Sequence, residues 1–486
     1  MNGRITTLMM IVLAAGAAHA ADVRPPKPLL PVPSAPLLAW QQDEIWMFQC
    51  FNMPSYPFAE ELIFTFLKPV PKSGERGARG FKATGREDPN LFNPTELDCD
   101  QWVKVAAAAG FKGIVLTTKH HDGFCIWPTA TTTHSVKSSS WRGGKGDVVA
   151  DFVKACRKGG LKVGLYYSIV DFNYLHSGRT KEDFPKYYQD QLTELLTNYG
   201  PIDEFWLDGC HAEMVNAPGG YGDDLMERLQ PDMVIVGPAG GGKKMMRNRG
   251  IACKESSSAN PDRSNVRGQK RDTSYWFPEE ACTIMTGGWF WQGPNTRRES
   301  LKTTLDIYYN TVGRGANLLL NVAADRRGKI DDASVKQLQE WRAALDQTFK
   351  VNLAAGMTAT ASNIRGGDKA FGPSQALDGN RETYWCTDDG VTNATMEVDL
   401  GGPCEFDVVL VQEYIALGQR VEKWRVESLS DATWTTVAGG ATIGQMRLER
   451  IKPVTATKVR LVIEKSAACP TIHAFGLYKQ AKPPVR

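Results

Sequence analysis

Two polar stretches of this chain each follow an apolar run. Asp208 closes the run at residues 204–207, and Lys119-His120-His121-Asp122 follows the run at residues 114–116. Apolar runs of this length are typical of buried parallel strands. Polar side chains at the ends of such strands are where α/β barrels carry out their chemistry. A carboxylate beside Trp206, together with two adjacent histidines, indicates a site that cleaves sugars.

The elements that must position these residues alternate between strands and helices. We expect strands at residues 113–118, 161–168, 202–207, 233–236 and 316–322, and helices at 147–156, 184–199, 225–229 and 301–312. Such alternation favours a parallel (β/α)8-like barrel, which we place at residues 37–350. A doubly wound nucleotide-binding sheet is the alternative. It lacks support because no glycine-rich turn follows the first strand.

After the barrel the pattern changes to short alternating segments separated by turn residues. Examples lie at residues 396–400, 407–411, 424–427 and 458–463. Several short strands at near-regular spacing predict an all-β sandwich, which we place at residues 355–480.

The N-terminus has the pattern of an export signal. Arg4 precedes an apolar stretch at residues 8–15, and small residues follow up to Ala20. This pattern predicts a signal peptide at residues 1–20 and a Pro-rich leader at residues 21–36. The apolar stretch is too short to cross a bilayer, so we expect a secreted or periplasmic protein with no membrane span.

The composition excludes some function classes. The 486 residues carry a net charge of only +3, and the basic residues are interspersed with acidic ones, so no nucleic-acid partner is expected. Of the ten cysteines, Cys125, Cys156, Cys210 and Cys282 lie within or beside apolar runs, which is typical of buried thiols. No CxxC pair supports a zinc or redox centre. Whether one disulfide forms stays open, since sequence cannot pair the cysteines.

Several sequence blocks occur together in one order. They are Thr84-Gly85-Arg86, Lys119-His120-His121-Asp122-Gly123-Phe124, Gly164-Leu165-Tyr166-Tyr167-Ser168, Trp206-Leu207-Asp208-Gly209, Gly288-Trp289-Phe290-Trp291 and Asn317-Leu318-Leu319-Leu320-Asn321-Val322. In these blocks the barrel region resembles the α-L-fucosidases of glycoside hydrolase family 29, especially the branch with plant and gut-bacterial enzymes. The tail, with Ala376-Leu377-Asp378-Gly379-Asn380 and Thr383-Tyr384-Trp385, resembles a discoidin, or coagulation-factor C-type, sandwich that often binds sugars.

The resemblance implies a retaining exo-fucosidase that needs no cofactor and acts on fucosylated glycans. Asp208 matches the family's nucleophile, and His120 and His121 match positions that bind sugar hydroxyls. Tyr167 is expected to hydrogen-bond Asp208. Aromatic faces for the sugar ring and its methyl group are expected from Trp127, Trp206 and Trp291. A retaining enzyme also needs a second carboxyl as acid and then base.

The chain departs from the family pattern at several positions. Cys50 stands where the family has a histidine, Phe81-Lys82 where it has Glu-Trp, and His134 where it has a tyrosine. The expected acid position reads Asn248-Arg249 and holds no carboxylate. Three possibilities remain for the acid, namely Glu255, Glu280 on the aglycone side, or none.

Three functions therefore stay open. The first is an exported retaining exo-α-L-fucosidase, the second a same-fold glycosidase for another α-linked sugar, and the third a catalytically impaired glycan-binding homologue. A cationic set could favour an anionic substrate such as a sulfated fucan: Lys82, Lys243, Lys244, Arg247 and Arg249. The barrel needs no metal, whereas Asp378 could contribute to a structural calcium site in the sandwich.

Overall fold

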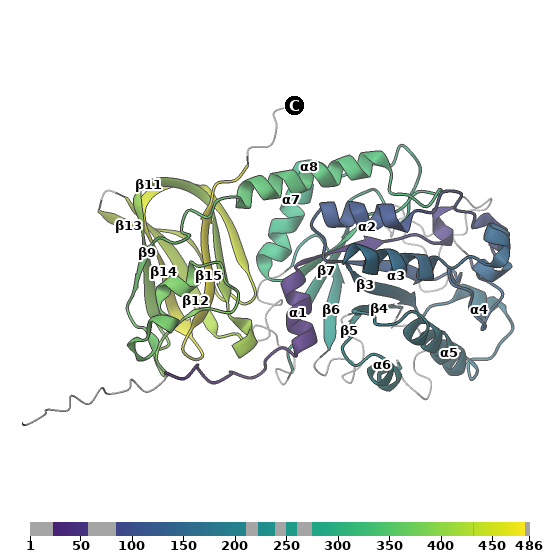
Figure 1. Cartoon of the computed structure of the whole chain (residues 1–486), viewed down its shortest axis with the longest axis horizontal. Coiled ribbons are helices and arrows are strands. Elements are labelled where there is room, and N and C mark those ends of the chain that lie inside the picture. Colours follow the sequence, from purple (N-terminus) through teal and green to yellow (C-terminus); the bar gives the residue numbers. More distant parts are fainter. Residues whose placement is uncertain are drawn as a thin grey trace, which may run out of the picture.

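The computed structural model describes residues 23–56, 84–209, 222–238, 249–259, 275–430 and 432–481. It contains two bodies side by side, a barrel and a β-sandwich (Figure 1). The predicted fold class, a (β/α)8-like barrel followed by an all-β domain, is confirmed. None of the helices in these ranges is both long and apolar enough to cross a bilayer.

Eight parallel strands close the barrel in sequence order. They are β1 Ile45–Gln49, β2 Gly113–Lys119, β3 Lys162–Ser168, β4 Glu204–Asp208, β5 Val234–Pro238, β6 Gly250–Glu255, β7 Glu279–Ile284 and β8 Asn317–Asn321. Strands β1, β6 and β7 were not predicted from the sequence. β6 and β7 carry charged residues, so neither gives a continuous apolar run, whereas β1 is an apolar run as long as β4 and could have been predicted.

Helices surround the barrel. They are α1 Ala35–Asp43, α2 Cys99–Ala108, α3 Val148–Gly159, α4 Phe172–His176, α5 Phe184–Thr197, α6 Asp223–Leu229, α7 Leu301–Asn310 and α8 Asp332–Phe349. Side-chain caps fix the starts of all of these helices except α5 and α6. The carboxylate of Asp147, for example, accepts the amide N–H of Ala150 at the start of α3. Gly160 ends the same helix in the left-handed conformation that glycine adopts without strain.

Strand alternation divides the apolar side chains into two layers. One set of positions on the strands faces the barrel interior and includes Phe48, Tyr166 and Trp206. The alternate positions, including Tyr167 and Leu207, pack against the surrounding helices. Each strand therefore sends every second residue toward the axis, and this parity decides which residues can reach a pocket inside the barrel.

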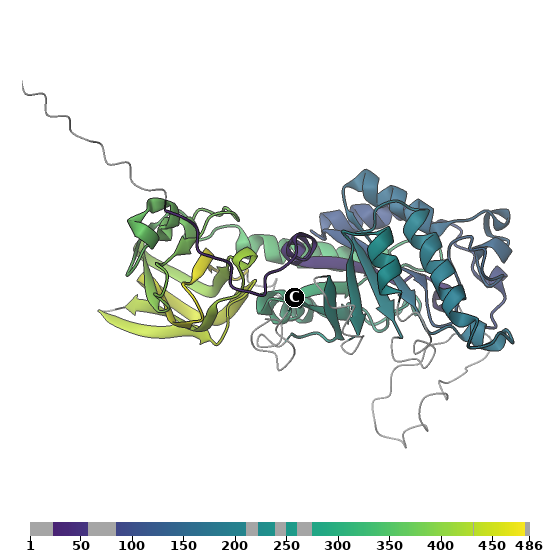
Figure 2. The ribbon, with the colours of Figure 1, turned by 90° about the horizontal axis from the view of Figure 1, so that it is seen from below.

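Helix α1 lies against the amino ends of the barrel strands. The indole N–H of Trp40 donates to Glu204, the first residue of β4, at 2.7 Å, and Asn317, the first residue of β8, donates to the Trp40 carbonyl at 2.6 Å. The predicted leader precedes α1. From residue 23 it runs along the sandwich, where Arg420 donates to the Lys27 carbonyl at 2.6 Å (Figure 2). The signal peptide prediction lies outside the described residues.

The sandwich contains seven strands. They are β9 Thr358–Ala361, β10 Trp385–Cys386, β11 Ala394–Glu413, β12 Val421–Ser430, β13 Thr433–Gly440, β14 Arg447–Ser466 and β15 Thr471–Tyr478. Their order is β10-β15-β11-β14-β12-β13, with β9 also paired to β11. The segments expected at residues 396–400 and 407–411 are one long strand, β11. Register shifts between Asp399 and Cys404, and between Phe406 and Val408, bend it.

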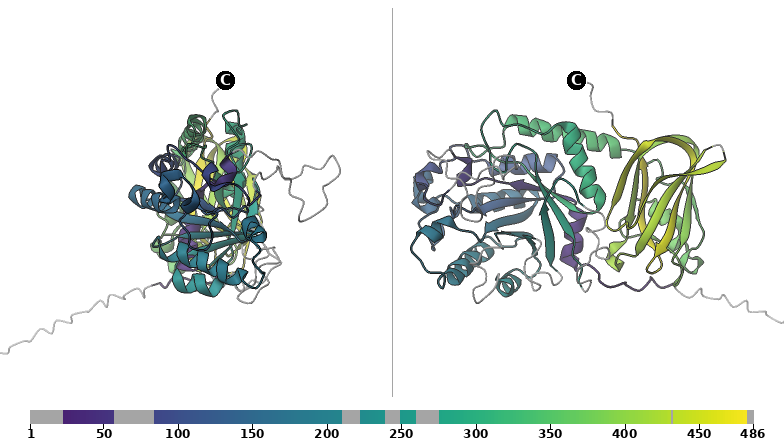
Figure 3. Two further views of the ribbon diagram at one scale, coloured as in Figure 1. Left: turned by 90° about the vertical axis from the view of Figure 1, so that its right-hand side faces the viewer. Right: turned by 180° about the vertical axis from the view of Figure 1, so that it is seen from behind.

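Ion pairs and ring contacts join the two bodies. Arg450 of β14 reaches Asp306 of α7 at 2.6 Å, and Arg314, which follows α7, reaches Glu449 at 2.6 Å. At the end of α8, the ring of Phe349 packs edge-on against Tyr478 of β15. Figure 3 shows the barrel and the sandwich side by side from two further directions. The sandwich is therefore packed against the barrel rather than hanging from a linker.

Candidate active site

A pocket opens at the carboxyl ends of the barrel strands, away from α1. Its empty space is about 350 Å³, a figure that includes the part open to solvent. Its lining comes from six strands and the segments that follow them: Phe48, Cys50, Thr117, His120, Tyr166, Trp206, Asp208, Glu255, Cys282, Trp289 and Phe290.

Asp208, the last residue of β4, is held from several sides. The phenol of Tyr166 donates to its Oδ2 at 2.5 Å, and the backbone N–H of Gly209 donates to its Oδ1 at 2.6 Å. Nε2 of His121 lies 3.5 Å from Oδ2. The carboxylate keeps 26% of its side-chain surface exposed, so it is both oriented by the protein and open to the pocket.

The second carboxylate of the pocket is Glu255, the last residue of β6. Glu255 belongs to the exposed residues, yet the protein around its carboxyl and the negative charge of Asp208 raise its pKa above the ordinary value. A group with a raised pKa keeps its proton at higher pH and can therefore donate it. The pocket thus combines a carboxylate with oriented oxygens and a carboxyl that holds its proton more strongly.

The two histidines after β2 sit beside Asp208. His120 lines the pocket, where its ring stacks on Tyr166 with an interplanar angle of 15°. Nδ1 of His121 lies 2.6 Å from Oγ of Ser168. Burial lowers the pKa of both histidines, so both are neutral at physiological pH and each offers one donor and one acceptor nitrogen. This suits recognition of neutral hydroxyl groups.

The predicted contact between Tyr167 and Asp208 is wrong, and Tyr166 makes it instead. Tyr166 pairs with Trp206 across β3 and β4, so it shares the interior face with Asp208, two residues further along β4. Tyr167 has the opposite parity and lies outside the strands, where its hydroxyl donates to Gln191 at 2.6 Å. Strand parity could have selected Tyr166 from the sequence alone.

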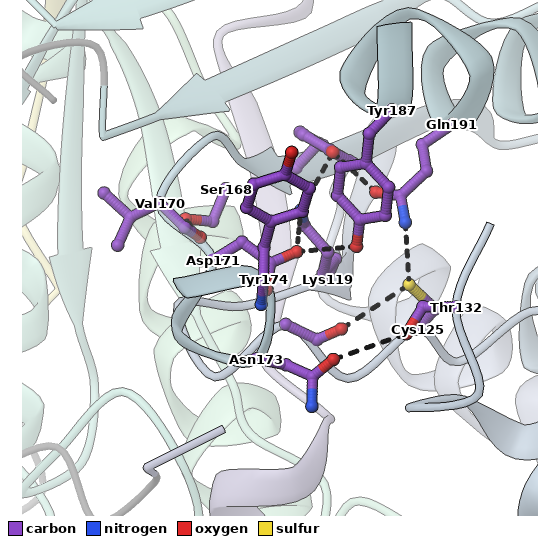
Figure 4. Close-up of polar contacts among 12 residues, drawn as sticks. Lys119, Cys125, Thr132, Ser168, Val170, Asp171, Asn173, Tyr174, Tyr187 and Gln191 are labelled. Atoms are coloured by element: carbon purple, nitrogen blue, oxygen red, sulfur yellow. Dashed lines mark hydrogen bonds and ion pairs between the residues drawn. The ribbon is translucent and has the colours of Figure 1, made fainter. Parts of the chain in front are cut away.

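Tyr167 instead belongs to a buried polar network around an ion pair. In that pair, Lys119 Nζ lies 2.9 Å from Asp171 Oδ2, and both side chains are fully buried (Figure 4). Tyr187 donates to the same Asp171 oxygen at 2.8 Å, and Tyr167 accepts from Lys119 at 2.8 Å. The adjacent backbone bond from Phe172 to the His121 carbonyl ties this network to the loop that carries the histidines.

Of the three tryptophans expected to face the sugar, one lies in the pocket. Trp206 lines it and stacks on Tyr166 with ring centroids 5.3 Å apart. Trp127 does not line it. Its ring is buried in the helix layer, and its N–H donates to Glu194 at 2.8 Å. Trp291 lies beside Arg326, whose guanidinium carbon is 5.2 Å from the ring centroid, and its neighbours Trp289 and Phe290 line the pocket instead.

Glu280 lies below the pocket, inside the barrel. It is 1% exposed, and the N–H of Trp206 donates to it at 3.0 Å, so it is not placed to protonate a bound sugar. Burial raises its pKa to about 7. Burial and the Glu280 charge likewise raise the pKa of Glu204, which is bound to Trp40. The two carboxyls and the two indoles form a buried chain from α1 to the pocket floor.

Cys50 and Arg249, two of the other positions singled out in the sequence, lie within the described residues. Cys50 lines the pocket, as its match to a family sugar-binding position implied. Arg249 precedes β6 at the amino end of the barrel, where it donates to the Gln230 carbonyl at 3.2 Å, so it does not reach the pocket. Asn248, Phe81-Lys82 and the other members of the cationic set, Lys82, Lys243, Lys244 and Arg247, lie outside the described residues.

The calcium expectation in the sandwich stays a prediction. Both oxygens of Asp378 already accept hydrogen bonds, from the Asn380 N–H at 2.8 Å and the Thr383 hydroxyl at 2.7 Å. Within the described ranges, no group of three or more His, Cys, Asp and Glu side chains is placed to hold a metal ion.

A parallel barrel with two carboxyls in one aromatic pocket is the architecture of a glycoside-cleaving enzyme. The family model for α-L-fucosidase matches residues 80–347, and that for the F5/8 type C domain matches residues 358–475. The chain therefore belongs to the α-L-fucosidase family, glycoside hydrolase family 29, and carries a C-terminal discoidin domain.

Individual relatives agree over nearly the whole chain. Alpha-L-fucosidase 1 of Arabidopsis thaliana is 33% identical over 93% of this chain and 88% of its own length. The Ruminococcus gnavus GH29 fucosidase E1_10125, solved in complex with fucose, has a TM-score of 0.80 and 27% identity, covering 96% of this chain and 98% of that one. The solved SpGH29 has a TM-score of 0.80 and 30% identity, covering 94% and 100%.

The neighbouring tyrosines of β3 allow a matched pair of substitutions. Tyr166→Phe removes the hydrogen bond to Asp208 and is expected to lower kcat/KM by about 10- to 100-fold, since a bond to a charged group contributes roughly 1.5–3 kcal/mol. Tyr167→Phe is expected to leave kcat/KM within about threefold and to destabilise the fold by about 1–3 kcal/mol, because buried Gln191 and Lys119 lose a partner. Hydrolysis kinetics and urea unfolding separate the two effects. Equal activity losses would contradict the assignment.

The buried Glu280 predicts a pH-dependent stability. A carboxyl whose pKa rises from 4.5 to about 7 on folding contributes stability below pH 4.5 that is lost as the pH rises through 7. The amide in Glu280→Gln still accepts the Trp206 hydrogen bond, but it does not titrate. We therefore expect the free energy of unfolding to fall less between pH 5 and pH 8 in Glu280→Gln than in the parent chain, and the difference to be on the order of 3 kcal/mol.

Urea unfolding at the two pH values measures this difference. Glu227→Gln, on an exposed position of α6, is the control and is expected to retain the parent pH dependence. An unchanged pH dependence in Glu280→Gln would show that this carboxyl is not held protonated.

Proposed function

We propose that this α-L-fucosidase is an exported, retaining exo-enzyme that releases terminal fucose from glycans through a covalent intermediate on Asp208. The observation that carries the proposal is the pairing, in one pocket, of the oriented Asp208 carboxylate with Glu255. Exo-action is part of the proposal because the resemblance to glycoside hydrolase family 29 implies it.

In the first step, an Asp208 oxygen attacks the anomeric carbon of fucose. The hydrogen bonds from Tyr166 and Gly209 orient the carboxylate, and the adjacent His121 restricts its position. A C–O ester bond forms while the glycosidic C–O bond breaks. The leaving oxygen takes the proton of Glu255.

In the second step, Glu255 acts as a base. Once Asp208 is esterified its negative charge is gone, so the second of the two causes that raise the pKa of Glu255, after burial, no longer acts. The pKa of Glu255 then falls, which favours the ionised form that takes a proton from water. Water attacks the anomeric carbon and releases Asp208, and the two inversions give net retention.

The pocket lining supports a deoxy sugar. Its apolar part is formed by Phe48, Trp289 and Phe290, which suit a methyl group in place of a hydroxymethyl group. Its polar part contains His120 and Tyr166, which can bind ring hydroxyls. The Ruminococcus gnavus relative, solved with fucose, supports the same sugar here.

A second candidate is a same-fold glycosidase for another α-linked sugar. It is favoured by Cys50, a pocket residue whose thiol is a weaker hydrogen-bonding group than the histidine of the family pattern. Arg249, the described member of the cationic set, points away from the pocket and gives a sulfated substrate no support.

Kinetics on two kinds of fucoside test the two carboxyl roles. Asp208→Ala is expected to lower kcat/KM at least about 10³-fold on every fucoside, because no other group can form the ester. Glu255→Ala is expected to lose about 10²- to 10⁴-fold on a fucosyl disaccharide, yet little kcat/KM on an aryl α-L-fucoside, whose good leaving group needs no acid. Lys254→Gln, exposed on the same strand, is the control.

Several outcomes would contradict this account. Equal losses for Glu255→Ala on both substrates would remove Glu255 as the acid. If the parent chain hydrolyses no fucoside but cleaves another aryl α-glycoside, the second candidate replaces the first.

Export has its own test. The full chain, produced in a bacterial host, is expected to lose residues 1–20 and to appear outside the cytoplasm with Ala21 as its N-terminus. The intact mass of the fractionated protein measures this. A cytoplasmic product with an uncleaved N-terminus would contradict export.

A further inference from the structure

Two thiols meet at the edge of the sandwich, far from the pocket in the barrel. Cys386 ends β10, and Cys469 lies in the turn that leads into β15, the strand that pairs with β10. The Cys386 thiol donates to the Thr387 carbonyl at 3.2 Å, and it lies close enough to the Cys469 thiol for a hydrogen bond between them to shift the pKa of each. Both residues are nearly inaccessible, at 0% and 3% exposure, and they pack with Phe371 and Tyr384 in one small cluster.

The groups around the two thiols shift their pKa values in opposite directions. Nη1 of Arg420 lies 3.2 Å from Sγ of Cys469 and also donates to the Cys469 carbonyl at 3.0 Å. The hydrogen bond from Cys386 and the Arg420 charge lower the pKa of Cys469 to about 7, whereas the same hydrogen bond and burial raise the pKa of Cys386. One sulfur is thus ready to act as a thiolate while its neighbour keeps its proton, which is the starting state for thiol–disulfide exchange.

We propose that Cys386 and Cys469 form a disulfide in the native protein under oxidising conditions. With glutathione disulfide as oxidant, the Cys469 thiolate attacks one glutathione sulfur and expels a glutathione thiolate. Cys386 then gives up its proton, and its sulfur attacks the Cys469 sulfur of the mixed disulfide, which releases the second glutathione. Two thiols are oxidised by two electrons, and one glutathione disulfide is reduced to two glutathione molecules.

The bond would fasten the part of the sandwich that holds the N-terminal leader. Arg420, which contacts Cys469, donates to the Lys27 carbonyl at 2.6 Å. Arg365 donates to the Arg24 carbonyl at 2.6 Å and pairs with Asp389, which also lies 3.7 Å from Cys469 Sγ. β10 is only two residues long, so a covalent link to the turn before β15 would hold both this edge strand and the leader beside it.

A second pair of neighbouring thiols lies in the barrel, but neither of its members has a lowered pKa. Cys253 and Cys282 also hydrogen-bond each other, across β6 and β7. Both lie in the barrel interior, and burial raises the pKa of Cys282 to about 11 and that of Cys253 further. Neither sulfur is therefore available as a thiolate near neutral pH, and this pair is expected to stay reduced.

Peptide mapping tests the pairing directly. The purified full chain is incubated with excess glutathione disulfide until its free-thiol count is constant, alkylated, and cleaved by trypsin and a Glu-specific protease. Cleavage after Glu397 separates Cys386 from Cys404, which otherwise share one tryptic peptide. We expect Cys386 linked to Cys469. Free alkylated Cys386 and Cys469, or a link from either to another cysteine, would overturn the proposal.

A stability measurement supplies a second readout. The oxidised chain is expected to melt about 5–10 °C higher than the same chain reduced by a phosphine, since a disulfide that closes a long loop contributes a few kcal/mol. Cys386→Ser and Cys469→Ser are expected to abolish the redox dependence, while the control Cys404→Ser, in the same domain, keeps it. A parent chain that melts at one temperature in both states would also overturn the proposal.

Discussion

The alternation of side chains along parallel strands in a closed barrel is the constraint on which this structure depends. Because every second residue points to the axis, β3 and β4 bring Tyr166, Trp206 and Asp208 to one face, and β6 brings Glu255 to the same pocket. The carboxyl ends of all eight strands meet at one end of the barrel, so residues far apart in sequence share one site. Lys119 departs from this alternation. A register shift after Thr117, at the end of β2, turns its side chain into the layer under the helices, where it pairs with Asp171 and both side chains are fully buried.

Inside the barrel, a row of polar contacts runs through the otherwise apolar core, from α1 to the pocket. From the helix that caps the amino end, Trp40 binds Glu204, Glu280 binds Trp206, and Trp206 stacks on the Tyr166 that holds Asp208. Each indole N–H finds a buried acceptor, which burial of such groups requires. Burial makes the charged forms of Glu204 and Glu280 unfavourable, and their pKa values are raised for this reason. Trp206 on the pocket floor is therefore positioned by Trp40, Glu204 and Glu280, none of which lines the pocket.

The barrel could be predicted from the sequence because β2, β3, β4, β5 and β8 are continuous apolar runs, and because the sequence blocks around Asp208 and His120-His121 are specific. Predictions of pocket residues were wrong where they depended on the direction in which a side chain points. Tyr167 and Trp127 match the expected residue types, but strand parity and the helix layer turn both away from the pocket. The position of Glu280 below Trp206 depends on the register between β6, β7 and β8, which no local pattern encodes. The missed strand β6 hid the fact that Glu255 ends a barrel strand.

The central claim is that Asp208 becomes covalently bonded to the sugar. Incubation with a 2-deoxy-2-fluoro-α-L-fucosyl donor carrying a good leaving group slows both steps, the second most, so an intermediate accumulates. Mass spectrometry of proteolytic peptides then locates the added sugar. The account predicts one fluorofucosyl group per chain, on the peptide that contains Asp208 and on that residue. A sugar attached to another residue, or steady turnover of natural fucosides with an inverted product and no adduct, would contradict it.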